Sequence, residues 1–115
     1  GIGYCHVPSG DKYMGLAIQR RAVKDYLRRG GVSYEVIMDE EDADAVDRER
    51  FQDLIMQICN KECSILIIVG ALCVAETKPQ YRLFKLICKT NRVKLINLSD
   101  QPGFNLNAYM YINKK

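Results

Sequence analysis

The chain has 115 residues, of which 48% are hydrophobic and 27% charged, a composition typical of one globular domain and too short for two. No apolar run approaches the ~20 residues that cross a bilayer, and the N-terminus lacks the basic stretch and apolar core of a secretory signal. We therefore expect a single intracellular domain over residues 1–115, in the cytoplasm and nucleoid or in the nucleus. The net charge of +3 is too small to identify a nucleic-acid partner by itself.

The cysteines are odd in number and lack paired C-x-x-C spacing, so we expect reduced, buried thiols. They are Cys5, Cys59, Cys63, Cys73 and Cys88. Cys59 and Cys63 lie four residues apart near a predicted helix end, where they could offer two metal ligands. No second Cys or His pair completes a tetrahedral site, so we expect no metal, and nothing in the sequence implies a cofactor.

The first third of the chain predicts a strand, a helix and a second strand. Residues 2–7 are typical of a strand, and the turn-forming residues 8–11 follow it. Apolar residues recur at three- and four-residue spacing from about residue 13 to 29, which predicts an amphipathic helix. Gly30 and Gly31 should end that helix, and residues 34–38 form a short β-prone segment.

An acidic run follows, and we expect it to form a surface loop because it is too charged to be buried. Its members are Asp39, Glu40, Glu41, Asp42, Asp44 and Asp47. The spacing of Phe51, Leu54, Ile55, Ile58 and Cys59 then predicts a helix with Asp47 as its N-cap. The continuous apolar run at 65–69 fits a strand buried on both faces at the centre of a parallel sheet.

The last third predicts a helix over 81–89, a strand over 93–97 and an edge strand within 108–112. Strands that alternate with helices imply an α/β fold with a mostly parallel central sheet of four to five strands and helices on both faces. Ligands bind such sheets at the carboxyl ends of the strands. Three segments should meet there: residues 8–11, the acidic loop from Asp39, and residues 70–78.

These segments also carry a family resemblance. Gly-Tyr-Cys-His-Val-Pro-Ser at 3–9 resembles the G-Y-x-R-V-S-T strand and turn of resolvase/invertase serine recombinases, and residues 16–25 resemble their first helix. Met38-Asp39 and the Asp47-Arg48-Glu49-Arg50-Phe51 element match the family's acidic strand end and its D-R-x-x-F/L motif, and residues 64–69 match the strand before L-D-R-L-S-R. The similarity spans about residues 2–100 and implies a single resolvase-like domain of the type that forms the recombinase N-terminal catalytic unit.

The resemblance also implies that the catalytic cluster is lost. The family attacks a DNA phosphodiester with a serine, and arginines stabilise the phosphoryl oxygens. Here His6 stands at the family's first arginine and Pro8 at its nucleophilic serine, while Cys73 and Glu76 stand at the two arginines of L-D-R-L-S-R. Asp39 and Arg48 remain. Removing one such donor costs about 10²–10³ in rate, so we expect an inactive domain that serves as a protein-interaction or assembly module of a DNA-associated protein.

Two alternatives stay open. Ser9 could replace the nucleophile one residue later and act with Arg48 in a divergent active recombinase, or Ser9 could be a turn or helix-cap residue. A small anionic ligand or nucleotide could bind beside Lys12 at the strand end.

His6 is either a titratable substitute for the missing arginine or a neutral, hydrogen-bonded side chain. Arg48 either holds a phosphate or forms a surface ion pair.

The first predicted helix has a basic character, from Arg20, Arg21, Lys24, Arg28 and Arg29. These side chains either contact DNA backbone non-specifically or form a solvated helix face. Tyr109 and Tyr111 alternate with apolar residues, so the tail should pair with another chain or close the domain's own sheet edge. Members of the resembled family dimerise through a long helix after the last core strand. In this sequence Pro102 and Gly103 follow the last predicted strand, and they do not favour such a helix. A homo-oligomer or protein partner remains the expectation, with DNA a weaker one.

Overall fold

The computed structural model describes residues 1–7, 12–31, 33–41 and 44–110, with the side chains of 12–14, 107 and 110 left out of the description. Strands and helices alternate along the chain in the order β1 (Ile2–His6), α1 (Lys12–Arg29), β2 (Glu35–Asp39), α2 (Glu49–Cys59), β3 (Ile65–Ile68), α3 (Lys78–Thr90) and β4 (Lys94–Asn97). Short 3-10 helices occupy Ala45–Asp47, Ala71–Cys73, Leu98–Asp100 and Leu106–Met110.

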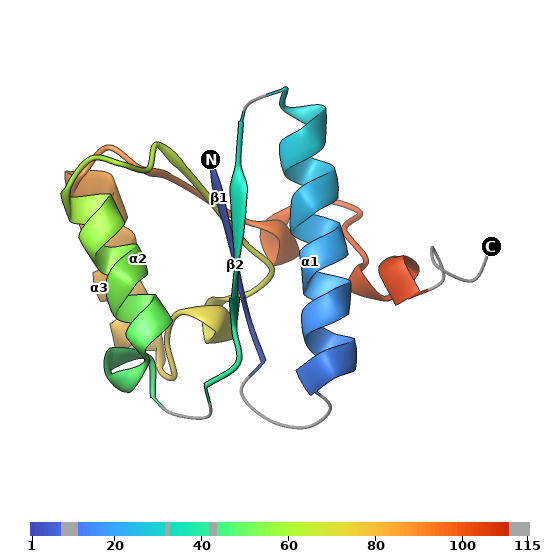
Figure 1. The fold of residues 1–115 in the computed structure, drawn as a ribbon, viewed down its shortest axis with the longest axis horizontal. Coiled ribbons are helices and arrows are strands. Elements are labelled where there is room, and N and C mark those ends of the chain that lie inside the picture. The colour runs from blue at the N-terminus through green and yellow to red at the C-terminus, as the bar shows by residue number, and fades with distance from the viewer. Residues whose placement is uncertain (8–11, 32, 42–43, 111–115) are drawn as a thin grey trace.

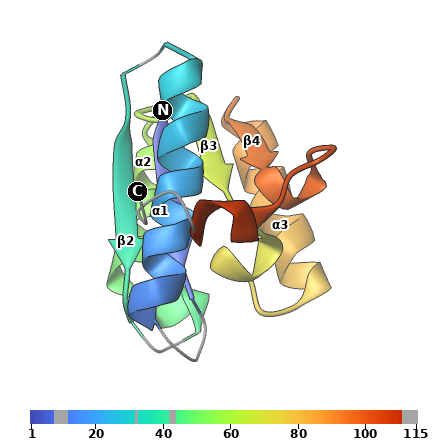
Figure 2. The same ribbon diagram turned by 90° about the vertical axis from the view of Figure 1, so that its right-hand side faces the viewer.

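The strands form one parallel, four-stranded sheet in the order β2-β1-β3-β4. Helix α1 covers one face of the sheet, and α2 and α3 cover the other (Figure 1). Seen from the side, the Leu106–Met110 helix lies beside α1 (Figure 2). The predicted α/β fold, with a parallel sheet and helices on both faces, is therefore confirmed.

The core forms where the apolar patterns predicted it. Leu66, Ile67 and Ile68 of β3 are fully buried, as expected for a central strand with helices on both sides. On α2 the residues Phe51, Leu54 and Ile58 are buried, as the helical spacing predicted. Helix α1 ends as predicted, because Gly31 adopts a left-handed φ of 69° and its N–H binds the carbonyl of Arg28.

Three local expectations need correction. Helix α3 begins at Lys78 instead of 81, because Thr77 and Gln80 form a capping box at its start. Asp47 does not cap α2, since it ends the preceding 3-10 helix and Arg48 occupies the N-cap position. Four of the cysteines are buried as expected, but Cys59 is exposed, because it is the last residue of α2.

The predicted edge strand in the tail is wrong for the residues that are described there. Leu106–Met110 is a 3-10 helix, and Tyr111 and Ile112 lie outside the described residues. Tyr109 fastens this segment to α1, because its hydroxyl donates to Asp25 Oδ2 at 3.0 Å and its carbonyl accepts from Arg21 Nη1 at 3.0 Å. Contacts with a helix, and not a sheet edge, therefore determine its conformation. None of the helices in the described ranges is both long and apolar enough to span a membrane.

Gly3 allows α1 to pack closely on β1, which gives a stability prediction. A Cβ at Gly3 would lie 2.9 Å from Val23 Cγ2 and 3.1 Å from Val23 Cβ. Gly3→Ala should therefore lower the free energy of unfolding by about 1–3 kcal/mol in urea titrations. The double variant with Val23→Ala should lose less stability than the sum of the two single changes, and Gly30→Ala at the exposed helix end is the control. Equal midpoints for Gly3→Ala and wild type would refute the close approach.

Candidate functional site

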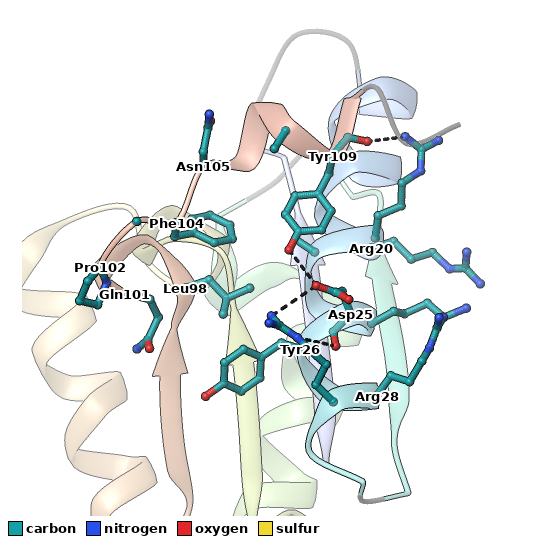
Figure 3. A pocket seen from close by; sticks show the side chains of 16 residues that line it. Arg20, Asp25, Tyr26, Arg28, Leu98, Gln101, Pro102, Phe104, Asn105 and Tyr109 are labelled. Atoms are coloured by element: carbon teal, nitrogen blue, oxygen red, sulfur yellow. Dashed lines mark hydrogen bonds and ion pairs between the residues drawn. The ribbon is translucent and has the colours of Figure 1, made fainter. Parts of the chain in front are cut away.

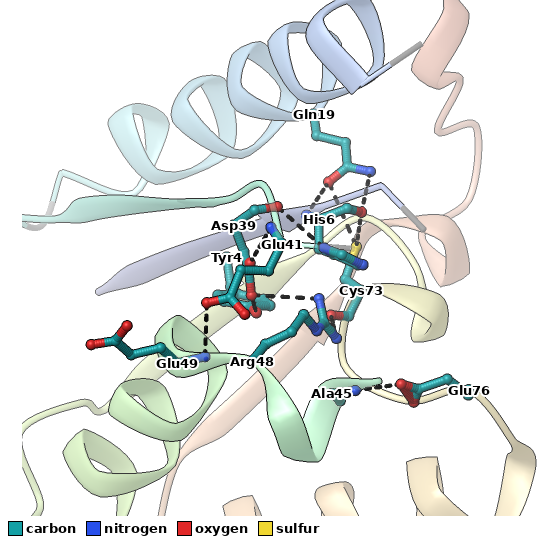
Figure 4. Close-up of polar contacts among 10 residues, drawn as sticks. All are labelled: Tyr4, His6, Gln19, Asp39, Glu41, Ala45, Arg48, Glu49, Cys73 and Glu76. Carbon is teal, nitrogen blue, oxygen red and sulfur yellow. Dashed lines mark hydrogen bonds and ion pairs between the residues drawn. The ribbon is translucent and has the colours of Figure 1, made fainter. Parts of the chain in front are cut away.

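The carboxyl ends of β1 and β2 bring a group of polar side chains together (Figure 4). His6 and Asp39 are register partners on the two strands. The Asp39 carboxylate accepts a hydrogen bond from the Tyr4 hydroxyl and pairs with Arg48 Nη1 at 3.5 Å. Arg48 Nη2 donates to the carbonyl of Cys73 at 3.2 Å. We call Tyr4, Asp39 and Arg48, with the backbone of Cys73, the strand-end cluster.

Burial of this cluster overturns two expectations. Glu40, Glu41, Asp44 and Asp47 are exposed as predicted, but Asp39 is 0% exposed; Asp42 lies outside the described residues. Arg48 is 1% exposed, so its ion pair is a buried one and not the surface pair considered from the sequence. Two charges tolerate such burial only when each neutralises the other and hydrogen bonds satisfy the remaining polar atoms.

The guanidinium of Arg48 is nearly satisfied within the domain. Besides Asp39 and Cys73, the Phe51 ring lies 5.7 Å from its central carbon, close enough for a cation–π contact. Within the described ranges only Nε of Arg48 is buried without a hydrogen-bond partner. An unsatisfied donor of this kind costs about 1–3 kcal/mol, so the ion pair must offset that cost as well as its own desolvation.

Gln19 clamps the end of β1 from α1. Its Oε1 accepts from the His6 N–H at 2.9 Å, and its Nε2 donates to the His6 carbonyl at 2.9 Å. The buried Cys73 thiol also contacts the His6 carbonyl and Gln19 Oε1, each at 3.6 Å. His6 Nδ1 lies 3.2 Å from the Asp39 carbonyl, and the side chain is buried. His6 is thus a buried, hydrogen-bonded side chain, which is one of the two alternatives that the sequence left open.

The acidic loop and the loop after β3 satisfy backbone groups at the same end of the sheet. Glu41 Oε1 accepts from the Glu49 N–H at 3.1 Å, so a distant glutamate serves the first turn of α2 in place of Asp47. The Glu76 carboxylate accepts from the Ala45 N–H. The sequence-predicted positions Pro8 and Ser9, with Gly10 and the side chain of Lys12, lie outside the described residues.

The electrostatics of the site keep its nucleophilic groups protonated. Burial raises the pKa of the Cys73 thiol, and the bonds to the His6, Val69 and Gly70 backbone only partly oppose this. Burial and the hydrogen bond to Asp39 raise the pKa of Tyr4 far above its ordinary value. The Cys73 thiol and the Tyr4 phenol therefore act as hydrogen-bond donors at neutral pH. Their bonds hold the polypeptide backbone and Asp39 in place, and neither group is ionised to act as a nucleophile.

Tyr4 and Gln19 complete the site, although neither is among the site residues predicted from the sequence. Gln19 carried a detectable sign, because it lies three residues after Leu16 and four before Val23, and therefore on the buried face of α1. Tyr4 carried none, since a tyrosine in a buried strand is ordinary.

The basic residues predicted on α1 gather elsewhere. Arg20, Arg21, Lys24 and Arg28 line a groove of about 800 Å³ between α1 and the C-terminal segment, on the helix-covered face opposite α2 and α3 (Figure 3). They are separate from the strand-end cluster, and contact with nucleic acid remains a prediction.

The buried ion pair predicts a large, non-additive effect on stability. Asp39→Ala leaves the Arg48 charge buried without its partner, so we expect a loss of about 3–5 kcal/mol of unfolding free energy. Replacing both residues, as Asp39→Leu with Arg48→Met, should cost much less than the sum of the single changes. Arg29→Ala breaks the exposed pair with Asp25 (3.3 Å) and should cost under about 1 kcal/mol. Additive losses from Asp39 and Arg48 would contradict the pair.

Tyr4 predicts a pH dependence. Its pKa is raised in the folded state above the ordinary value of 10.0, so the unfolded chain loses the proton first and stability falls as pH rises above 10. Tyr4→Phe should cost about 1–3 kcal/mol at pH 7 by removing the bond to Asp39. It should also reduce the alkaline slope by about 1.4 kcal/mol per pH unit. Urea midpoints from pH 7 to 11 test this, with Tyr34→Phe as control; an unchanged slope would refute it.

Comparisons with known proteins agree with this fold. No protein-family model matches the sequence, and no curated protein matches it. Among solved structures, the C-terminal catalytic domain of ISC1926 TnpA, an IS607-like serine recombinase, is 16% identical with a TM-score of 0.72, covering 87% of this chain and 70% of that one. The first open reading frame of transposon ISC1904 from Sulfolobus solfataricus P2 is 18% identical with a TM-score of 0.69, covering 90% and 70%. The chain therefore has the fold of a serine recombinase catalytic domain.

Proposed function

We propose that this domain is a catalytically inactive relative of serine recombinases that works as an interaction or assembly module of an intracellular, DNA-associated protein. The observation that carries the proposal is the burial of Arg48, the one arginine left of the family's cluster. It is 1% exposed and is held by Asp39 and by the carbonyl of Cys73.

Strand exchange requires donors that are free to meet a phosphate. A guanidinium helps phosphoryl transfer only when it is positioned against the oxygens where negative charge develops. To reach a phosphate, Arg48 would have to leave Asp39, and breaking a buried pair costs about 3–5 kcal/mol. That cost opposes the alternative in which Ser9 and Arg48 form a divergent active site.

The other family positions also support a non-catalytic role. His6, at the first arginine position, is buried and hydrogen-bonded to the backbone of Asp39. Glu76, at the last arginine position, places a carboxylate where the family has a cation and binds the Ala45 N–H. A carboxylate at this position repels a phosphate instead of binding it. The polar groups of the strand end bond to one another, which also disfavours a small-anion sensor at that place.

Exposed apolar side chains support the interaction role. Leu83 and Leu86 of α3 are each 58% exposed and lie three residues apart, so they share one face of the helix. Neighbouring exposed leucines on a surface helix are typical of contact surfaces. The association with DNA rests on the recombinase and the transposon reading frame that share the fold.

One experiment with two measurements tests the proposal. The protein is incubated with supercoiled plasmid DNA, quenched with detergent and analysed for nicks and for a covalent protein–DNA adduct. Because no free arginine is expected to meet the phosphate, we expect neither product. In parallel, sedimentation velocity over a range of protein concentrations should show a defined dimer or larger assembly.

Matched variants make both measurements decisive. An adduct that forms with wild type and disappears in Ser9→Ala would overturn the proposal in favour of an active recombinase. For assembly, Leu83→Glu with Leu86→Glu should return the protein to monomer, whereas Arg82→Glu on the same helix should not. A protein that stays monomeric at all concentrations, and that binds no protein in the extract of its own host, would contradict the interaction role.

A further inference from the structure

We propose that the groove between α1 and the C-terminal segment binds a small phosphorylated ligand with a planar aromatic ring, of the nucleotide class. We call it the α1 groove; it lies between α1 and residues 98–109 and has a volume of about 800 Å³. None of the residues of the strand-end cluster lines this groove, so a ligand could bind here whether or not the cluster is catalytic.

Charge is concentrated in this groove. Among the described residues that line it, five are cationic, Arg20, Arg21, Lys24, Arg28 and Arg29, and Asp25 alone carries a carboxylate. This local excess is larger than the net charge of +3 of the whole chain. A concave surface lined by one sign of charge focuses the field and attracts ions of the opposite sign, so the groove favours an anion.

The one carboxylate is already engaged. Asp25 Oδ2 lies 3.3 Å from Arg29 Nη2 and accepts a hydrogen bond from the Tyr109 hydroxyl at 3.0 Å (Figure 3). By contrast, Arg20, Lys24 and Arg28 form no ion pair within the described part of the chain. They follow one another at four-residue steps, a row with about 6 Å of rise per step. This row can meet a chain of phosphate groups.

Aromatic side chains supply a second kind of surface. Tyr26 comes from α1, and Phe104 and Tyr109 come from the C-terminal segment, with the last two rings 6.3 Å apart at an interplanar angle of 32°. Figure 3 shows Phe104 and Tyr109 on the C-terminal segment, with the Tyr109 hydroxyl directed at Asp25 of α1. Ring faces beside cations suit a ligand that joins a planar base to phosphates. The Gln101 amide at the rim adds a hydrogen-bonding group for such a base.

The size and the fastening of the groove favour a small ligand over a nucleic-acid strand. Small-molecule sites occupy about 300–1,000 Å³ and are largely preformed, and the α1 groove falls within that range. The bonds of Tyr109 to Asp25 and Arg21 fasten the second wall of the groove to α1. A duplex needs a longer, open basic surface to neutralise several phosphates.

Binding of ATP without divalent cations tests the proposal by calorimetry and by thermal shift at physiological salt. We expect ATP to bind at least about ten-fold more tightly than adenosine or pyrophosphate, because it uses both the aromatic and the cationic surface. Lys24→Glu with Arg28→Glu should weaken ATP binding by at least about ten-fold through charge reversal. Phe104→Ala should weaken ATP binding but leave pyrophosphate binding unchanged.

The control is a double variant on α3, on the other face of the sheet, that changes the net charge by the same amount as Lys24→Glu with Arg28→Glu. Arg82→Glu with Lys89→Glu on α3 should leave ATP affinity within about two-fold of wild type. Melting curves of the free variants verify that each is folded. The proposal is overturned if ATP does not bind, or if both double variants weaken it equally. It is also overturned if a 20-base-pair duplex binds through Lys24 and Arg28 and ATP fails to compete.

Discussion

The buried ion pair between Asp39 and Arg48 constrains the whole carboxyl end of the sheet. Each charge would be costly to bury alone, so the domain must bring β2 and the start of α2 together to hold the pair. The Tyr4 hydroxyl and the Cys73 carbonyl join it from β1 and from the loop after β3. One electrostatic requirement thus holds four separate segments of the chain together at this end of the sheet.

The features of the fold that depend on short-range patterns of apolar residues are predictable from the sequence. The continuous apolar run of β3 predicts a central strand, because a strand buried on both faces has no polar positions. The three- and four-residue spacing of Phe51, Leu54 and Ile58 predicts a helix buried on one face. Asp39 could not be placed in the same way. Its neighbours are acidic and exposed, and only the tertiary arrangement brings a guanidinium nine residues later against its carboxylate. The Glu41 bond to the α2 N-terminus and the docking of Tyr109 are non-local for the same reason.

The resemblance seen in the sequence and the solved structures lead to the same fold, at identities of 16% and 18%. Similarity at this level establishes a shared fold, and a shared fold does not determine catalytic activity. At the strand end of this chain, the polar groups bond within the domain: His6 bonds to the backbone of β2, the Cys73 thiol to β1 and Gln19, and Glu76 to Ala45. Because these polar atoms bind one another, Arg48 Nε is the one side-chain nitrogen or oxygen left buried without a partner among the described residues.

Helix α1 explains how one domain can keep a closed strand end and an open basic groove. Successive residues of a helix point about 100° apart, so Gln19 faces β1 while Arg20, the next residue, lines the groove. The clamp on His6 depends on the buried face of the helix, and the charge of the groove depends on side chains that are not part of the core. Changes to Lys24 or Arg28 therefore alter the electrostatic field of the groove without loosening β1. Changes to Gln19 disturb the strand end and leave the cations in place, so the two sites are separable by mutation even though one helix supports both.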